Sequence, residues 1–285
     1  MTLPPRGPAP RPARSRAPRA RTARPRKAKR APKTLAARLR TEAAVFLLAL
    51  QFLTRLPIPA RGYSAARMSA TPRWLPAVGA LIGGMVALAW LAAAAVFPPA
   101  PAMLLATAFG LLLTGCFHED GFADACDGLG GGATRARALE IMRDSRLGTY
   151  GAAGLGMMLA TKVATLMALP GALVPLALVA GHAASRASAV VVIATSAYVR
   201  DHGTGKPVAT GLSRRSLAFA LACGLAPLLV LPPLAALGGL AGLILGHLAM
   251  RRTYQRKLGG YTGDCLGAVQ QVSEVGFYLG LLACL

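Results

Sequence analysis

Four of the ten acidic residues in this chain lie within the nine positions from Glu119 to Asp127. Three of them, Asp120, Asp124 and Asp127, follow the spacing i, i+4, i+7, which places three carboxylates on one face of a helix. Like charges stacked in this way repel each other and destabilise an isolated helix. A divalent cation removes that conflict, and Mg²⁺ binds carboxylate oxygens together with phosphate oxygens and water. The spacing therefore predicts a magnesium site, against the alternative of a solvated acidic helix end.

The segment 137–152 carries a second group of charged residues, directly before an apolar stretch. Arg143 and Arg146 are candidates to hold a diphosphate, because guanidinium groups donate paired hydrogen bonds to phosphate oxygens. Asp144, between them, is a candidate to bind the metal or to orient a nucleophile. The alternative is an ordinary helix with ion pairs three or four positions apart, each worth about 0.2–0.5 kcal/mol. This segment alone does not decide between the two.

Several ionisable residues lie inside apolar stretches. A glycine-rich turn holds Asp264, and Glu274 follows a few helical turns later in such a stretch. Lys162, His182 and Arg186 are embedded in the same way. Ionisable residues in these surroundings are candidates for function, with ion pairing inside the protein as the alternative. His182 and Arg186 are four positions apart and share a helix face, so they either pair with an acid or, for Arg186, bind phosphate.

Three more residues are candidates to bind the phosphate groups of a substrate. Arg55 lies in the turn "LTRLP", and Lys206 lies in the glycine-containing segment "RDHGTGKP". Gly263 directly precedes Asp264, and glycine lets a phosphate approach the backbone closely. Eight of the ten acids lie in the segments 118–148 and 257–274. This concentration predicts a Mg²⁺-dependent phosphoryl or nucleotidyl transfer at a membrane surface.

The elements that carry these residues are long apolar stretches. The 285-residue chain is 54% hydrophobic with a mean hydropathy of +0.50, which is too apolar for an ordinary soluble domain. A membrane-spanning helix needs about 20 apolar residues. Stretches of about this length are 74–97, 101–117, 150–169, 172–198, 216–232 and 234–250. With 271–285 as a shorter candidate and 43–57 expected to be interfacial or re-entrant, we predict an all-α, multi-pass transmembrane bundle of about six to seven spans.

The loops between these stretches alternate in charge. Uncharged turns are 97–102, 169–173 and 231–235, whereas Lys and Arg gather in 60–73, 118–148, 199–215 and 251–270. Because basic loops stay in the cytoplasm, we expect the active-site loops and the N-terminal tail on the cytoplasmic face of the cell inner membrane.

The first 40 residues form a basic tail. They hold 14 of the 32 Lys and Arg and none of the acids, and they are rich in Pro and Ala. Such a composition predicts disorder, so we expect a disordered tail at 1–40 and a transmembrane helical catalytic domain at 41–285. No folded basic domain follows the tail, which argues against a nucleic-acid partner. Contact with the anionic lipid bilayer is the favoured interpretation, and a homo-oligomer stays open.

Four motifs, in this order and spacing, are similar to those of the cobalamin synthase family, the adenosylcobinamide-GDP ribazoletransferases. The motifs are "FLTRLPIP" at 52–59, "HEDGFADACDGLGGG" at 118–132, "ALEIMRDSRLGTYGA" at 138–152 and "GGYTGDCLGA" at 259–268. The resemblance covers 43–285 and leaves the tail outside. One departure is that the family often has leucine where this chain has Glu119.

The resemblance implies a membrane enzyme that uses Mg²⁺ to join adenosylcobinamide-GDP to α-ribazole or α-ribazole 5′-phosphate, with release of GMP. The metal ligands expected on these positions are Asp120, Asp124 and Asp127, with Glu119 or Asp144 completing the shell. The residues expected to act on the substrates are Arg143, Arg146 and Asp264, the last as a second metal ligand or as the group that orients the attacking hydroxyl.

Two other classes of membrane protein also carry clustered acids. A CDP-alcohol phosphotransferase-like enzyme has an Asp-Gly-x-x-Ala-Arg opening, whereas here Asp120-Gly121 is followed by Ala123-Asp124 and only one compact cluster is present. An ion transporter places its acids near the membrane midplane, whereas these acids lie at the ends of apolar stretches. Both alternatives are therefore weaker than the transferase.

Overall fold

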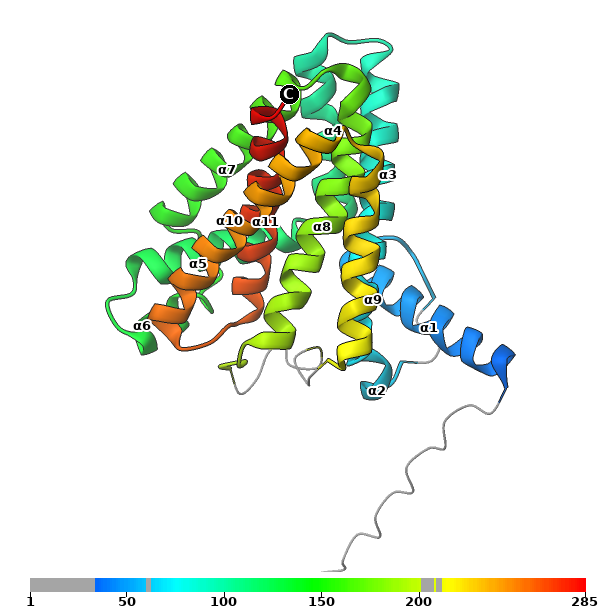
Figure 1. Ribbon diagram of the computed structural model, residues 1–285. Coiled ribbons are helices and arrows are strands. Elements are labelled where there is room, and N and C mark those ends of the chain that lie inside the picture. Colours follow the sequence, from blue (N-terminus) through cyan, green and yellow to red (C-terminus); the bar gives the residue numbers. More distant parts are fainter. Residues whose placement is uncertain (1–33, 60–62, 201–207, 209–211) are drawn as a thin grey trace, which may run out of the picture.

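The computed structural model describes residues 34–59, 63–200, 208 and 212–285, and these are helical throughout their length apart from short connections (Figure 1). The α-helices are α1 Leu35–Leu53, α2 Ala65–Met68, α3 Leu75–Ala94, α4 Pro99–Thr114, α5 Phe117–Gly131, α6 Arg135–Ile141, α7 Thr149–Ala168, α8 Val174–Thr195, α9 Arg214–Leu225, α10 Pro233–Leu258 and α11 Gly263–Ala283. Short 3-10 helices are η1 Thr71–Trp74, η2 Gly171–Leu173 and η4 Ala226–Val230. The prediction of an all-α fold is confirmed.

Four helical segments in the described part of the chain are long and apolar enough to cross a membrane. They are Ala65–Ala94, Thr149–Ala168, Gly171–Thr195 and Pro233–Leu258. A fifth candidate arises only if α4 and α5 count together, although an 89° bend separates them. The stretch predicted at 216–232 is divided, because α9 ends at Leu225 and a 3-10 helix containing a proline follows. The structure thus yields four to five candidates, and the predicted count of about six to seven is not confirmed.

Two helices differ from their expected lengths. The short candidate at 271–285 is the C-terminal part of α11, which starts at Gly263 and has 21 residues. The segment 43–57 belongs to α1, which starts at Leu35 behind the capping hydroxyl of Thr34. The helical part therefore begins a few residues before the boundary expected at residue 40, and residues 1–33 lie outside the described part of the chain.

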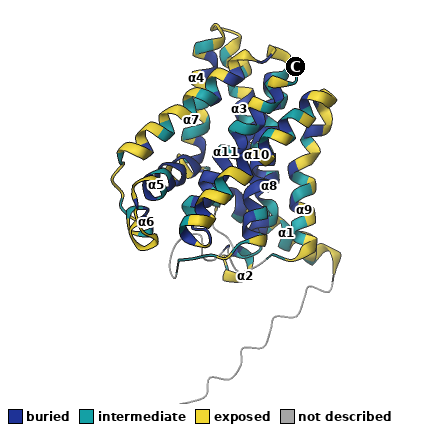
Figure 2. Ribbon diagram, turned by 60° about the vertical axis from the view of Figure 1, so that its left-hand side comes forward, coloured by how far each residue is buried: buried dark blue, intermediate teal, exposed yellow. Residues whose placement is uncertain are grey.

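The centre of the bundle is formed by α8 and α11, whose buried residues appear dark blue in Figure 2. α11 packs antiparallel to α10 with close backbone contact between Gly242 and Gly276. It also packs on α5, α7 and α8. Large apolar side chains on the outer faces are exposed, such as Leu88, Leu112 and Leu245. Exposed apolar side chains on the outer faces fit a protein that lies in a bilayer.

The acidic segment 118–148, expected as a loop between spans, forms the two helices α5 and α6. α5 starts after a sharp turn in which Gly115 and Cys116 both have positive φ, at 64° and 57°. This left-handed conformation is unstrained for glycine and uncommon for cysteine. The turn sends α5 off at 89° to α4, so that α5 runs across the bundle (Figure 1). Its acidic residues consequently meet α11 instead of continuing the direction of α4.

Candidate functional site

α5 and α11, which carry most of the predicted site residues, cross each other at glycines. A Cβ atom on Gly121 would lie 3.2 Å from the Cα of Asp264, and one on Gly267 would lie 2.9 Å from the carbonyl oxygen of His118. The absence of side chains at both positions lets the two backbones approach closely. The crossing brings Asp120 of α5 to the same cavity as Asp264, although the two segments are far apart in the sequence.

A cavity of about 130 Å³ opens at this crossing. Its charged and polar lining comes from Asp120 and His118 of α5, Asp264 of α11 and Arg186 of α8. Gly263 also lines it, and apolar walls come mainly from α1, α5, α8 and α11. Three of the predicted site residues, Asp120, Gly263 and Asp264, therefore share one cavity.

The carboxylates around this cavity are electrostatically coupled. Burial raises the pKa of Asp264, the Arg200 guanidinium opposes that shift, and the nearby charge of Asp120 adds to it. Nη2 of Arg200 lies 2.8 Å from Oδ2 of Asp264, and the Thr262 hydroxyl donates to the same oxygen at 3.3 Å. Asp124, one turn after Asp120 on α5, is acted on by the charges of both Asp120 and Asp264. We call these three coupled acids, Asp120, Asp124 and Asp264, the carboxylate group; burial and mutual repulsion disfavour the charged forms of Asp124 and Asp264.

Arg200, which pairs with Asp264 beside the cavity, was not among the candidate residues predicted from the sequence. A single parallel bridge between Tyr198 and Tyr261 joins the end of α8 to the turn before α11, with Val199 N donating to Tyr261 O at 3.0 Å. Gly260 is required there, because a Cβ would collide with Ala197 and Val199. The available signal was that Arg200 is the first basic residue of the segment 199–215; Lys206, the candidate predicted in that segment, lies outside the described residues.

Asp127 lies on α5 but has different partners. Its Oδ2 accepts from the backbone N–H of Gly148 at 2.7 Å, and its Oδ1 accepts from that of Gly151 at 2.8 Å. These two N–H groups belong to the N-terminus of α7, so the carboxylate caps that helix. A Cβ on either glycine would collide with the carboxylate. The role of Asp127 as a metal ligand stays a prediction, while its contacts give it a structural role.

Glu119 is buried and points into the bundle. Its Oε1 accepts from Nε2 of Gln271 at 2.8 Å, and its Oε2 has no hydrogen-bond partner within the described residues. It lines a second, smaller cavity of about 40 Å³ together with Lys162, Arg186 and Glu274. Its predicted place in the metal shell therefore stays a prediction, since its neighbours in this structure belong to a different polar cluster.

This second polar cluster, which we call the inner cluster, contains Glu119, Lys162, His182, Gln271 and Glu274. Lys162, His182 and Glu274 are ionisable residues that lie inside apolar stretches of the sequence. Glu274, which is 1% exposed, lies 3.0 Å from Nζ of Lys162 and 3.8 Å from Nδ1 of His182. Ser185 donates to Glu274 at 3.2 Å, and Lys162 also donates to Gln271 at 2.6 Å. Of the two alternatives for these embedded residues, pairing with an acid across the bundle is seen for Lys162, while His182 lies beside the same carboxylate.

The loop after α6 holds Asp144 and Arg146 as an exposed ion pair. Nη2 of Arg146 lies 2.6 Å from Oδ2 of Asp144, and hydrogen bonds from the Arg146 side chain and backbone lower the pKa of Asp144 to about 2. Arg143 is exposed in the same loop. Asp144, Arg143 and Arg146 do not line the cavity of about 130 Å³ at the crossing of α5 and α11, which we call the carboxylate cavity. Their loop is tied to α5 through the bond between Gly148 and Asp127.

Arg55 lies at the turn that starts α5. Its backbone N–H donates to Leu113 O at 2.8 Å, and a side chain on Gly115 would collide with its guanidinium. Phe52 and Leu53, just before it in the chain, line the carboxylate cavity. Arg55 is therefore placed near the cavity without being part of its wall.

The carboxylates beside the cavity suit an open Mg²⁺ site, in which the protein supplies only part of the ligand shell. Among the described residues, no three His, Cys, Asp or Glu side chains stand close enough together to form a closed metal cage. Mg²⁺ commonly binds through one or two carboxylates and completes its shell with water and substrate phosphate. The carboxylate group fits such an open site, because its mutual repulsion is relieved by a cation.

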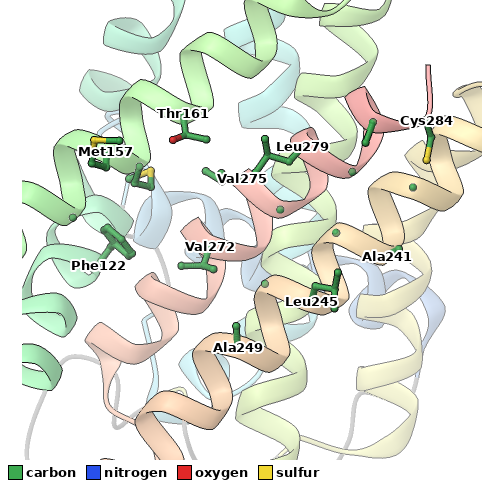
Figure 3. A pocket seen from close by; sticks show the side chains of 18 residues that line it. Phe122, Met157, Thr161, Ala241, Leu245, Ala249, Val272, Val275, Leu279 and Cys284 are labelled. Carbon is green, nitrogen blue, oxygen red and sulfur yellow. The ribbon is translucent and has the colours of Figure 1, made fainter.

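A larger hollow of about 800 Å³ lies elsewhere, along α7, α10 and α11 (Figure 3). It is lined by small and apolar residues such as Met157, Leu245 and Leu279, and no charged residue contributes to it. Chemistry on a diphosphate needs charged groups. The carboxylate cavity, although smaller, is therefore the candidate site.

Fold and cavity together define an all-helical protein with four to five apolar candidate spans and an acidic cavity at the crossing of two helices. The chain belongs to the cobalamin-5-phosphate synthase family, whose model matches residues 45–282. It is 46% identical over 257 residues to the adenosylcobinamide-GDP ribazoletransferase of Leptothrix cholodnii, covering 85% of this chain and 96% of that protein.

Other relatives carry the same name. The chain is 43% identical over 254 residues to the adenosylcobinamide-GDP ribazoletransferase of Ralstonia nicotianae, with 87% of this chain and 98% of the relative covered. The chain is 41% identical over 253 residues to the adenosylcobinamide-GDP ribazoletransferase of Vibrio parahaemolyticus, with 87% of this chain and 95% of the relative covered. Among solved structures, none matches the chain significantly.

Proposed function

We propose that this chain is a membrane enzyme that joins adenosylcobinamide-GDP to α-ribazole, or to α-ribazole 5′-phosphate, and releases GMP. The observation that carries the proposal is the cavity in which Asp120 and Asp264 meet, because these acids come from two separate segments of the family region. The names of the relatives support the choice of substrates.

The reaction is a substitution at phosphorus. A ribose hydroxyl of α-ribazole attacks the phosphorus that carries the cobinamide, and the bond from that phosphorus to the bridging oxygen breaks. GMP leaves with the electron pair, and the hydroxyl proton is released. When α-ribazole 5′-phosphate is the acceptor, its 5′ oxygen already carries phosphate, so another ribose hydroxyl is the nucleophile.

We propose Mg²⁺ as the cofactor, held by one or two carboxylates of Asp120, Asp124 and Asp264 together with water and phosphate oxygens. A bound Mg²⁺ would neutralise negative charge on the diphosphate and on the departing GMP. Arg200 holds the Asp264 carboxylate in place through their ion pair. Arg143 and Arg146 are proposed to bind the diphosphate from outside the cavity, which requires Arg146 to exchange Asp144 for a phosphate.

We also propose that the protein lies in the cell inner membrane with its site on the cytoplasmic side. The apolar helices favour insertion in the cell inner membrane, and the basic loops and tail favour a cytoplasmic orientation of the site. That orientation gives the site access to its nucleotide substrate.

The experiment supplies purified protein in detergent or lipid with adenosylcobinamide-GDP, α-ribazole and Mg²⁺. GMP release is followed with and without a chelator, and the corrinoid product is identified by mass. The proposal expects GMP and cobalamin in equal amounts, with both lost when the metal is removed. Well-folded protein that releases no GMP would contradict it, and lipid-headgroup nucleotides would then be the next donors to test.

A further inference from the structure

Arg186 occupies a position that none of the roles described so far explains. It lines the carboxylate cavity together with Ala189 and Ile193, which lie three and seven positions later on α8 and so on the same face. At 1.5 Å of rise per residue, this wall extends for about 10 Å from Ile193 to Arg186. Arg186 also lines the smaller cavity, so it stands between the carboxylate group and the inner cluster.

The guanidinium of Arg186 is held firmly in this position. Nη1 donates to the carbonyl oxygen of His182 at 2.9 Å and lies 3.1 Å from Nδ1 of the same residue. Gly79 of α3 makes room for the side chain, because a Cβ there would lie 2.7 Å from Cδ of Arg186. The residue is only 2% exposed. Its position is therefore fixed by packing before any ligand arrives.

The positive charge of Arg186 has no carboxylate within ion-pair distance among the described residues. None of the ion pairs found within the described residues involves it, although the charges of Glu274 and Glu119 act on it from further away. Its Nε has no hydrogen-bond partner in the described part of the chain. A buried cation with a free donor is costly unless an anion compensates it. Arg186 also lines the carboxylate cavity, so an anion bound in that cavity would lie beside this side chain.

We propose that Arg186 binds a phosphate oxygen of the diphosphate of adenosylcobinamide-GDP at the inner end of the carboxylate cavity. This inference rests on the proposed function. Asp120 and Asp264 line the same cavity and suit a metal ion, whereas a guanidinium suits the phosphate oxygens directly. His182 and Glu274 are then positioning residues, since the first holds the guanidinium and the second balances its charge.

The test compares Arg186→Gln and Arg186→Lys with the wild-type protein in detergent. The first measurement is the binding of GDP in the presence of Mg²⁺, by calorimetry. Loss of a charge-assisted hydrogen bond predicts binding about ten- to a hundredfold weaker for Arg186→Gln. Arg186→Lys keeps the charge and is expected to retain part of the affinity. Arg251→Gln is the matched control, because Arg251 lines neither of the two cavities and its side chain bonds only to Thr195 within the described residues.

A second measurement separates binding from structure. The KM for adenosylcobinamide-GDP is expected to rise by a similar factor in Arg186→Gln, while the KM for α-ribazole stays within about twofold of the wild-type value. Melting temperatures are recorded for every variant. A role confined to packing predicts instead that both KM values and the melting temperature change together, and that Arg186→Lys behaves like Arg186→Gln.

The outcomes distinguish the two proposals. If the wild-type protein transfers ribazole and Arg186→Gln binds GDP as tightly as the wild type, the role of Arg186 is overturned while the proposed function stands. If the wild-type protein neither releases GMP nor binds GDP, both are overturned. Wild-type transfer with weakened GDP binding in Arg186→Gln, partly restored in Arg186→Lys, supports both.

Discussion

Glu119 and Asp120 are neighbours in the sequence, yet they belong to two different regions of the molecule. Successive residues of a helix point about 100° apart, so Glu119 faces the inner cluster while Asp120 faces the carboxylate cavity. In the inner cluster, Glu274 has cationic and hydrogen-bonding partners. In the carboxylate group, the acids repel one another and Arg200 is the one cation paired with them among the described residues.

This difference between the two regions indicates which buried acids hold the fold together and which are available to bind a ligand. A buried acid whose oxygens are satisfied by side chains of neighbouring helices stabilises the bundle or fixes its geometry. Acids left facing one another across a cavity keep binding capacity for a cation and its phosphate ligand. Removal of an inner acid should therefore affect stability first, whereas removal of an outer acid should affect activity first.

The largest effect is expected in the inner cluster. Glu274→Gln leaves Lys162 buried without its anionic partner, which predicts a loss of about 3–5 kcal/mol in the free energy of unfolding. Unfolding in detergent, followed by circular dichroism, measures it. The double variant Lys162→Met with Glu274→Gln removes the stranded charge and is expected to recover much of the loss. A single variant as stable as the wild type would show that the cluster does not hold the bundle together.

The next effect is on catalysis at the carboxylate group. Asp264→Asn keeps the size of the side chain but removes its charge, and we expect the transfer rate to fall by about 10²–10³-fold. The melting temperature is expected to fall as well, because Arg200 loses its carboxylate partner, so rates are compared at a temperature where both proteins are folded. Rates and melting curves of the same preparation give both values. Normal transfer by Asp264→Asn would exclude Asp264 from the site.

A smaller effect is expected where Asp127 caps α7. Asp127→Ala removes the acceptor of two backbone N–H groups and predicts a loss of about 1–2 kcal/mol in the free energy of unfolding. Asp127→Asn keeps one acceptor oxygen and serves as the control with a smaller loss. If Asp127→Asn instead keeps full stability and loses transfer, Asp127 acts on the metal as the sequence spacing predicts.

The smallest effect is expected at the exposed pair of Asp144 and Arg146. Asp144→Asn breaks this pair, and the melting temperature should stay within experimental error, because water screens exposed charges. Glu140→Gln, which breaks the exposed pair with Arg137, is the matched control. A clear fall in melting temperature for Asp144→Asn alone would show that the loop is part of the folded core.

Part of this arrangement was predictable from the sequence. Apolar stretches predict helices because burial and lipid contact both favour them, and the spacing of Asp120, Asp124 and Asp127 indicates a helix that the structure contains as α5. The partners of these acids were not predictable. Asp127 meets Gly148 and Gly151 only because α7 starts beside it, a contact that no local pattern reveals.

The crossing of α5 and α11 lies beyond sequence patterns for the same reason. It depends on the bend at Gly115 and Cys116 and on the close approach of Gly121 and Gly267. Each of these glycines also fits an ordinary loop or a packing position. The span predicted at 216–232 is not confirmed, because hydropathy does not register the proline-containing 3-10 helix that follows Leu225.

The measurement that tests the account most directly is the Mg²⁺ dependence of transfer in Asp120→Asn and in Glu119→Gln. Adjacent positions on α5 make them a matched pair. We expect Asp120→Asn to raise the Mg²⁺ concentration for half-maximal rate by about tenfold or more, while Glu119→Gln leaves it unchanged. An unchanged Mg²⁺ requirement in Asp120→Asn, with a raised one in Glu119→Gln, would contradict it and place the metal in the inner cluster.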